Sequence, residues 1–401
     1  MAIRTEVLQL KDELVGIRRD LHAHPELGFE EYRTAGVVED YLRSLGLEPR
    51  RLAGTGVVAD LVGGAADSGP TLLLRSDIDA LPIQEANDVP YRSQNDGVMH
   101  ACGHDAHTAM LLIAARILVG MKDRIPGRIR FLFQPNEEVA GAEKMVEEGA
   151  LDDPPVDAAL GVHVWTPLPS GTVGATVGGV MSSMDVFRIV IKGKGGHTGY
   201  PESAIDPIIA AADLIQSAQR LQTRDISLLK PTALVFSKIQ GGTKNNIIPD
   251  DVVLEGSLRY LFDPRLDGDE DPPKRLEEIV AAVCAVHKCT YEYHVETENE
   301  VVVNAAEMVQ LVRETAGEIL EDEKNVVDHR SMAGEDFAAY AKRVPSAFVF
   351  LGTGNPAKGT DHPHHNPHFN IDEDTMPTGV ELFVRTALRF FEKNTTGERG
   401  L

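Results

Sequence analysis

Cysteine is scarce in this chain of 401 residues, which contains only Cys102, Cys284 and Cys289. Three cysteines in a chain of this length exclude a disulfide framework and fit a reducing compartment. The N-terminal residues mix acids and bases around apolar positions at helical spacing, which is not the pattern of a secretory signal. We therefore expect a cytoplasmic protein in which each cysteine has its own explanation.

Basic residues and long apolar runs are also few. Lys and Arg together number 39 against 62 Asp plus Glu, which gives a formal net charge of -23. Such a charge repels phosphate backbones and anionic lipid headgroups, so nucleic acid and membrane surfaces are not expected partners. The most apolar stretch, residues 110–121, is interrupted by Arg116 and is shorter than the roughly 18 to 20 residues of a membrane span.

The length predicts more than one domain, because a domain typically has on the order of 150 residues. Strand-like and helix-like segments alternate through the first 170 residues and again after residue 299, which is typical of an α/β fold. Residues 185–298 show the order β-α-β-β-α-β, which is that of ferredoxin-like units. The sequence thus predicts an α/β domain with a mixed sheet and flanking helices (1–184 and 299–401), interrupted by an inserted ferredoxin-like α+β domain (185–298).

The segment borders are predicted from the same patterns. Helices are expected near 34–45, 104–121, 138–149, 204–222, 274–287, 305–320, 334–343 and 376–393. The acidic, Pro-rich run 263–273 is interpreted as a surface loop leading into a helix, with a domain boundary as the alternative.

The densest group of chemically active side chains is MHACGHDAH at residues 99–107. A thiolate at Cys102 and an imidazole at His104, two positions apart on a turn, can reach one metal ion. A lone cysteine is more often a small buried hydrophobe. Here His100, Asp105 and His107 are also potential ligands, and burying so many polar groups unpaired would be costly, which favours a metal site.

A second candidate group follows the strand that ends in FQPNEE at 133–138. Glu137 and Glu138 stand at the end of a strand, where open α/β sheets bind ligands. The alternative is an ordinary acidic helix N-terminus. Two adjacent carboxylates can also divide labour, one binding a metal and the other accepting a proton from water.

Other strand ends and turns add candidates that are individually weak. Asp77 and Asp79 follow one strand, and His163 lies in another, although a single His or Asp is more often structural. Four histidines fall within residues 362–368, a metal signal that does not identify the binding ring. In the inserted segment His197 follows glycines in GGHT, which lacks the spacing of a nucleotide loop. The chain has no G-x-S-x-G, which counts against a serine hydrolase of the α/β-hydrolase type.

Taken together, these motifs resemble the M20 family of metallopeptidases, in particular its amidohydrolase subgroup, which includes hippurate hydrolases, N-acyl-amino-acid hydrolases and auxin-conjugate hydrolases. The resemblance runs nearly end to end through RRDLHAHPELGFEE (18–31), RSDIDALP (75–82), MHACGHDAH (99–107), FQPNEE (133–138), GGHT (195–198), NIIPD (246–250), MAGEDF (332–337) and HNPHFNIDE (365–373). It implies a metal-binding catalytic domain interrupted by a lid that usually mediates dimerisation.

The resemblance also implies roles for individual residues. It gives the metal ligands as Cys102, His104, Glu138, His163 and His365, with Glu137 as the catalytic base. It implies that Asp79 orients the site and that His197 and Asn246 of the lid complete a substrate and oxyanion site. One departure is Glu202, where many relatives have histidine after Pro201, so substrate preference transfers less well than mechanism.

The expected activity is metal-dependent hydrolysis of the amide bond in N-acyl amino acids, with one or two ions of Zn²⁺, Mn²⁺ or Co²⁺ per subunit. A dipeptidase or carboxypeptidase of the same family and a non-catalytic metal-binding relative are the alternatives. The expected partners are a small N-acyl amino acid or short peptide and further copies of the chain, in a homodimer or homotetramer.

Overall fold

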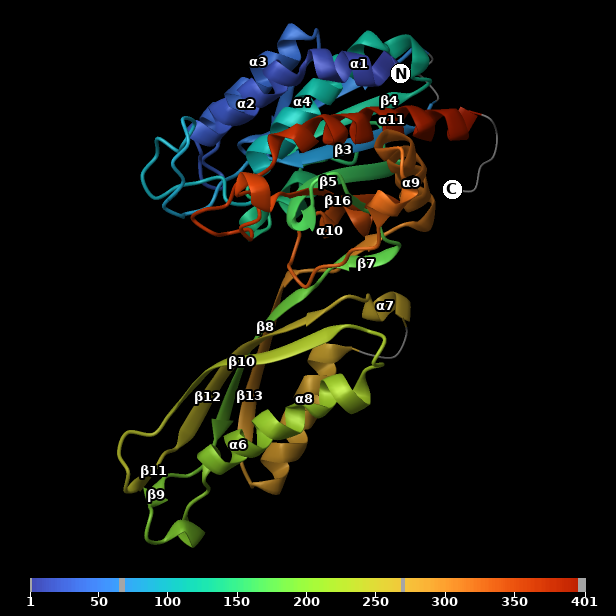
Figure 1. Cartoon of the computed structure of the whole chain (residues 1–401). Coiled ribbons are helices and arrows are strands. Elements are labelled where there is room, and N and C mark those ends of the chain that lie inside the picture. Colours follow the sequence, from blue (N-terminus) through green and yellow to red (C-terminus); the bar gives the residue numbers. More distant parts are fainter. Residues whose placement is uncertain (1, 65–68, 268–270, 396–401) are drawn as a thin grey trace. The chain divides into compact units, whose positions relative to one another are not determined.

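The computed structural model describes residues 2–64, 69–267 and 271–395 of the chain (Figure 1). The chain divides into two compact units. The first comprises Met1–Val180, Val302–Arg330 and Asp336–Leu401, and the second comprises Met181–Val301 and Ser331–Glu335.

The first unit is built on a mixed sheet of eight strands. In spatial order the strands are β1 (Arg50–Leu52), β2 (Gly56–Val62), β4 (Arg128–Gln134), β3 (Thr71–Asp77), β5 (Ala158–Pro169), β16 (Ser346–Gly354), β6 (Val173–Gly174) and β15 (Val326–Val327). The central strands β4, β3, β5 and β16 run parallel to one another, whereas β1, β2 and β6 introduce antiparallel pairs. A large mixed sheet with flanking helices is the predicted fold class of this part of the chain.

Helices flank this sheet. They are α1 (Ala2–Gln9), α2 (Lys11–Ala23), α3 (Tyr32–Ser44), α4 (His104–Gly120), α5 (Ala142–Glu147), α9 (Ala306–Leu320), α10 (Ala338–Ala341) and α11 (Met376–Thr395). Helix α4 is apolar on nearly all sides because it is buried between the strands and the helices α2 and α11 (Figure 1). Among the described residues no helix is both long and apolar enough to span a membrane.

Strand residues alternate between two buried faces of the sheet. Leu72 and Leu74 of β3 belong to the main apolar core, whereas Arg75, one position later, is buried outside that cluster. The same alternation in β4 separates the apolar core residue Phe133 from Gln134. The second face of the sheet thus carries the buried polar side chains of Arg75 and Gln134. The candidate site lies near these residues.

The second unit contains an antiparallel sheet with strands in the order β10 (Thr232–Gly241), β12 (Asp251–Tyr260), β8 (Met184–Lys192) and β13 (Thr290–Asn299). Helices α6 (Pro207–Ala218) and α8 (Pro272–Val286) pack on one face of it. Each begins with an Asp cap followed by proline: Asp206 accepts from the Ile208 amide and Asp271 from the Lys274 amide. The chain order is therefore β-α-β-β-α-β.

Smaller elements complete the second unit and its border. They are β9 (Gly196–His197), β11 (Ile247–Ile248), α7 (Pro264–Asp267), the 3-10 turn η3 (Pro201–Ser203) and the π-turn η4 (Leu221–Asp225), while β7 (Gly178–Met181) pairs with β14 (Val302–Asn304). Residues 268–270 of the predicted loop 263–273 lie outside the described residues. Residues 331–335 join this unit because Ser331 pairs with Met181 and the Met332 carbonyl accepts from Ser182 and Arg259, so the unit differs from the predicted range 185–298.

Two predicted helices are shorter than expected. The helix predicted near 334–343 is limited to α10, Ala338–Ala341. The helix predicted near 138–149 is divided into the 3-10 turn η2 (Glu137–Val139) and α5, because Ala140 has a left-handed φ of 74°. Before α10 the side chain of Asp336 accepts from Gln134, and before α5 the turn at Glu137–Val139 carries the two glutamates.

Candidate metal centre

The carboxyl ends of parallel strands bring the candidate ligands of the first unit together. Asp77 ends β3 and is followed by Asp79, Gln134 ends β4 shortly before Glu137, and His163 lies in β5 between these strands and β16. This is the edge at which open α/β sheets bind ligands. The N-terminus of α4 adds Cys102 and His104.

A glycine makes the turn before α4 possible. Gly103 has a φ of 94°, and a Cβ at this position would lie 2.3 Å from the Val164 side chain. A non-glycine residue would meet both backbone strain and a steric clash here. The turn thereby presents Cys102 and His104 on either side of the glycine.

Cys102, His104 and His163 form a buried group whose potential ligand atoms all lie within 4.8 Å of one another. The Cys102 Sγ atom lies 3.6 Å from His163 Nε2. The His163 Nδ1–H donates to the Val164 carbonyl at 2.6 Å, which leaves Nε2 with a lone pair. Burial, followed by the nearby His107 and His364, holds the pKa of His163 well below its usual value, so the ring is neutral at pH 7.

His104 occupies an environment that favours positive charge. Its Nδ1 lies 3.0 Å from an Asp79 oxygen, and its side chain is 1% exposed. Burial opposes the charged ring, but the carboxylates of Asp77, Asp79 and Glu138 outweigh it and raise the pKa of His104 to about 10. A divalent cation would satisfy the same carboxylates, with release of the ring proton.

A second group joins Cys102 to Glu138 and His365, again with ligand atoms within 4.8 Å of one another. His365 Nε2 lies 3.4 Å from Glu138 Oε1, and the His365 amide donates to the Ala101 carbonyl at 2.9 Å. His365 has a φ of 61°, an uncommon conformation that turns its ring to this position. The two groups share Cys102.

The donor chemistry of the cluster fits a metal. His104 Nε2 and Glu138 Oε1 are buried, lie 4.0 Å apart, and have no hydrogen-bond partner among the described residues. Orphaned buried polar atoms are costly unless a ligand satisfies them. Thiolate, imidazole and carboxylate ligands together suit Zn²⁺, Mn²⁺ or Co²⁺.

Glu137 lies at the border of this cluster. Its Oε2 atom is 3.7 Å from His104 Nε2, and the residue is 8% exposed. The neighbouring Glu138 amide donates to Asp79 Oδ2 at 3.1 Å, so Asp79 contacts both His104 and the loop of the two glutamates.

Of the other potential ligands in the MHACGHDAH segment, His107 and Asp105 have partners, whereas neither ring nitrogen of His100 has a hydrogen-bond partner among the described residues. His107 Nδ1 lies 2.6 Å from Asp77 and its Nε2 accepts from the Val164 amide at 2.8 Å, so both ring nitrogens are occupied. Asp105 forms ion pairs with Arg18 at 2.8 Å and His22 at 2.7 Å. Burial lowers the pKa of His100 to about 4, and His100 belongs to none of the ligand groups found in the described part of the chain.

The two candidates of the second unit lie together in a different environment. His197 and Asn246 line an open pocket of about 610 Å³ formed by residues 195–197, 242–243 and 246–251 of that unit. Strand β9 pairs His197 with Ile247 of β11. The Gly199 amide donates to His197 Nδ1 at 3.0 Å, so the neutral ring carries its proton on Nε2.

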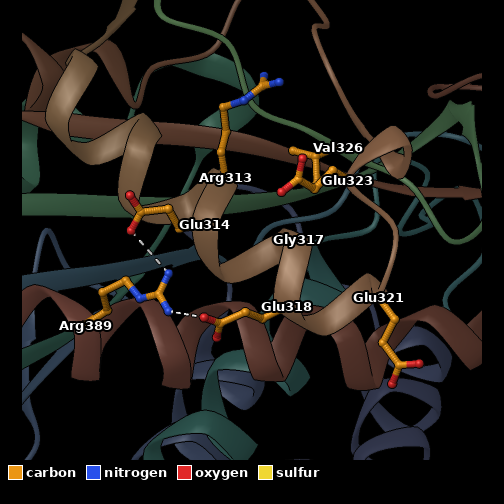
Figure 2. Close-up of a pocket in the computed structure, with 8 residues that line it drawn as sticks. All are labelled: Arg313, Glu314, Gly317, Glu318, Glu321, Glu323, Val326 and Arg389. Carbon is orange, nitrogen blue, oxygen red and sulfur yellow. Dashed lines mark hydrogen bonds and ion pairs between the residues drawn. The ribbon is translucent and has the colours of Figure 1, made fainter.

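A further pocket of about 800 Å³ lies between α9 and α11 and contains none of the predicted site residues. Figure 2 shows Arg389 of α11 bonded to both Glu314 and Glu318 of α9. These ion pairs tie two helices together, so we assign this pocket a structural character.

Sequence reasoning did not find Arg75, Gln134 and Asp336 as residues of this region. All three are buried and form hydrogen bonds with one another, and Asp336 also accepts from the amide of Ala142, which follows the loop of the two glutamates. The signal available in the sequence was an arginine directly after the apolar residues 72–74 of a predicted strand, because a charged residue in such a place needs a partner if it is buried.

Comparison with known proteins agrees with this geometry. The family described as Peptidase family M20/M25/M40 matches residues 73–389. Over 98% of both chains the sequence is 37% identical to thermostable carboxypeptidase 2 of Saccharolobus solfataricus. It is 39% identical to an N-acetyl-L-cysteine deacetylase of Bacillus subtilis, over 96% of this chain and 90% of the relative.

Solved structures show the same relationship. A Bacillus subtilis protein described as a dinuclear metal binding peptidase from the M20 family superposes with a TM-score of 0.83 at 34% identity, covering 96% of this chain and 99% of the other. A putative aminohydrolase from methicillin resistant Staphylococcus aureus gives a TM-score of 0.86 at 33% identity, over 97% and 99% of the two chains. The chain therefore belongs to peptidase family M20/M25/M40 and is a metal-dependent hydrolase.

Proposed function

We propose that this protein hydrolyses the amide bond of N-acyl amino acids, releasing a carboxylic acid and a free amino acid. The observation that carries the proposal is the place of Glu137, a buried carboxylate 3.7 Å from His104 at the border of the ligand cluster. A carboxylate there is suited to general base catalysis. The relative named N-acetyl-L-cysteine deacetylase supports an acyl substrate.

In this proposal Cys102, His104, Glu138, His163 and His365 would hold one or two divalent ions. Such an ion would supply Lewis-acid polarisation of the scissile carbonyl and would lower the pKa of a water molecule. Glu137 accepts a proton from the attacking water and passes it to the leaving amine nitrogen. Asp79 orients His104 through its hydrogen bond to Nδ1 and holds the amide of Glu138.

We assign the second unit a substrate-binding role. The Nε2–H of His197 is available to donate to the oxyanion of the tetrahedral intermediate, because Nδ1 already accepts from Gly199. Asn246 lines the same pocket and contacts the substrate. In this proposal the unit, predicted as residues 185–298, acts as a lid and a dimerisation domain in a homodimer or homotetramer.

The test is a hydrolysis screen with N-acetyl and N-benzoyl amino acids and with dipeptides, each with added Zn²⁺, Mn²⁺ or Co²⁺. The proposal expects the acyl substrates to be cleaved faster than the dipeptides. Preference for dipeptides would instead assign the dipeptidase or carboxypeptidase activity, for which the thermostable carboxypeptidase relative is the supporting observation. Metal binding without hydrolysis of any substrate would show a non-catalytic relative.

A further inference from the structure

The loop 135–141 carries Glu137 and Glu138 between β4 and α5, and its backbone is unusual. Asn136 and Ala140 have φ values of 52° and 74°, in the left-handed region that non-glycine residues rarely adopt. Such conformations persist only where the surroundings hold them in place. The loop therefore needs anchors if its two carboxylates are to keep their positions.

One carboxylate, that of Asp336, contacts both ends of this loop. The side chain of Gln134, the last residue of β4, donates from Nε2 to Asp336 Oδ1 at 2.7 Å and to Oδ2 at 2.8 Å. The backbone amide of Ala142, the first residue of α5, donates to Asp336 Oδ2 at 2.8 Å. Asp336 thus joins the residue before the loop to the residue after it.

Arg75 balances the charge of this buried carboxylate. Its Nη2 lies 3.2 Å from Asp336 Oδ1, its Nε donates to Gln134 Oε1 at 2.9 Å, and its Nη1 lies 2.6 Å from Asp77. Arg75 is 2% exposed and Asp336 5%. A buried carboxylate needs a charged partner and hydrogen-bond donors, and Asp336 has Arg75, Gln134 and the Ala142 amide in these roles.

Two further carboxylates hold the middle of the loop. Glu31 accepts from the Asn136 amide at 2.9 Å, and Asp79 accepts from the Glu138 amide at 3.1 Å. Neither contacts the ends of the loop in the hydrogen bonds described. Within the loop the Gly141 amide donates to the Asn136 carbonyl at 2.8 Å, and Asp336 contacts the two residues that flank the loop, Gln134 and Ala142.

We propose that Asp336 is a positioning residue that fixes Glu137 and Glu138 beside the metal ligands by closing the ends of loop 135–141. The inference rests on the proposed function for the catalytic role of Glu137. Its structural part, the placement of Glu138 as a ligand, is testable through metal affinity alone.

The experiment compares Asp336→Asn with a matched control, Asp60→Asn. Asp60 accepts from Arg130 Nε at 2.8 Å and Nη2 at 2.9 Å, and Arg130 is fully buried in β4, four residues before Gln134. Both variants remove a carboxylate charge from a buried arginine in the same sheet. Only Asp336 contacts the loop of the two glutamates.

The measurements are the dissociation constant for Zn²⁺ by chelator competition, kcat and KM of the holoenzyme with an N-acetyl amino acid, and Tm. Asp336→Asn is expected to weaken Zn²⁺ binding and to lower kcat, each by about 10- to 100-fold, the usual cost of losing a residue that supports a metal ligand. KM should change little. Asp60→Asn should lower Tm while the Zn²⁺ affinity and kcat stay at the wild-type values.

Equal Zn²⁺ affinity and kcat in the two variants, at a similar loss of Tm, would overturn the proposal and leave Asp336 a purely structural residue. If Asp336→Asn does not fold, Gln134→Met removes the donor at one end of the loop, and unchanged Zn²⁺ affinity in that variant would also contradict the proposal. If the wild-type protein hydrolyses no amide substrate, the proposed function fails, whereas the Zn²⁺ measurement still decides the role of Asp336.

Discussion

The two units of the chain hold their candidate residues in opposite ways. In the first unit His104 is buried among carboxylates beside a sheet whose central strands are covered on both faces. In the second unit His197 is exposed on a short strand and is oriented by the amide of Gly199. Buried polar groups must be satisfied by partners, and an exposed group is satisfied by water.

A buried site and an exposed site suit different functions. A metal site needs ligands that are fixed before the ion arrives, which the buried hydrogen bonds of the first unit provide. A residue that meets the substrate at a later step must instead stay accessible. We therefore expect substitution of the candidate residues in the first unit to alter metal content or chemistry, and substitution of the candidate residues in the second unit to alter turnover without loss of metal.

The largest expected effect is that of Glu137→Gln. Loss of the proton acceptor should lower kcat by about 10² to 10⁴, the contribution of general acid-base assistance. Metal content and Tm should remain those of the wild type, since the amide has the same shape. Steady-state kinetics with metal analysis of the purified variant checks this. The control is Glu143→Gln, which removes a partner of Arg343 at the surface and should keep full activity. A kcat near the wild-type value in Glu137→Gln would contradict the assignment of Glu137 as the general base.

Cys102→Ser tests whether the sulfur atom of Cys102 is a metal ligand of the first unit. A hydroxyl is a poor ligand for a borderline metal, so we expect Zn²⁺ affinity to fall by more than about 10²-fold, beyond the cost of losing a supporting residue. The control is Cys284→Ser in the second unit, where burial raises the pKa of the thiol to about 11 and no ligand group was found among the described residues. The Cys284→Ser variant should have a lower Tm than the wild type and the same metal content. Undiminished metal occupancy in Cys102→Ser would return Cys102 to the role of a buried hydrophobe.

His197→Ala tests the accessible side of the comparison. Removal of one oxyanion donor should lower kcat by about 10²-fold with a modest change in KM, and metal content should stay whole. His294→Ala, an exposed histidine of β13 in the same unit, serves as the control with unchanged kcat. Loss of metal in His197→Ala would make His197 a ligand, whereas unchanged activity would make it structural.

Metal removal should abolish hydrolysis, but its effect on stability is the smallest effect expected here and should be confined to the first unit. A ligand that binds only the folded state stabilises it by about 2.7 kcal/mol at a concentration of 100 times Kd. Chelation should therefore speed amide hydrogen exchange in β3 and β4, while exchange in β8 and β12 should stay unchanged. An equal increase in the rate of amide exchange in both units would contradict the expectation that the metal stabilises only the first unit.

The sequence predicted most elements of the fold because their signals are local. The apolar run at 71–74 and the change to polar residues after it correspond to β3, Thr71–Asp77. The helices predicted near 204–222 and 274–287 correspond to α6, Pro207–Ala218, and α8, Pro272–Val286. Helix α10 was predicted too long, because amphipathic spacing cannot show that Asp336 is engaged by Gln134, 202 residues away.

Within the candidate site, the proximity of Cys102 and His104 follows from the sequence alone, because a single glycine separates them. Which histidines of the same motifs already have hydrogen-bond partners is visible only in the folded chain. His107 is used by Asp77 and Val164, and His364 bonds the Val164 carbonyl and stacks on Trp165, whereas His365 faces Glu138. The physical reason is that hydrogen-bond partners are set by which strands become neighbours, and strand order is a property of the whole sheet.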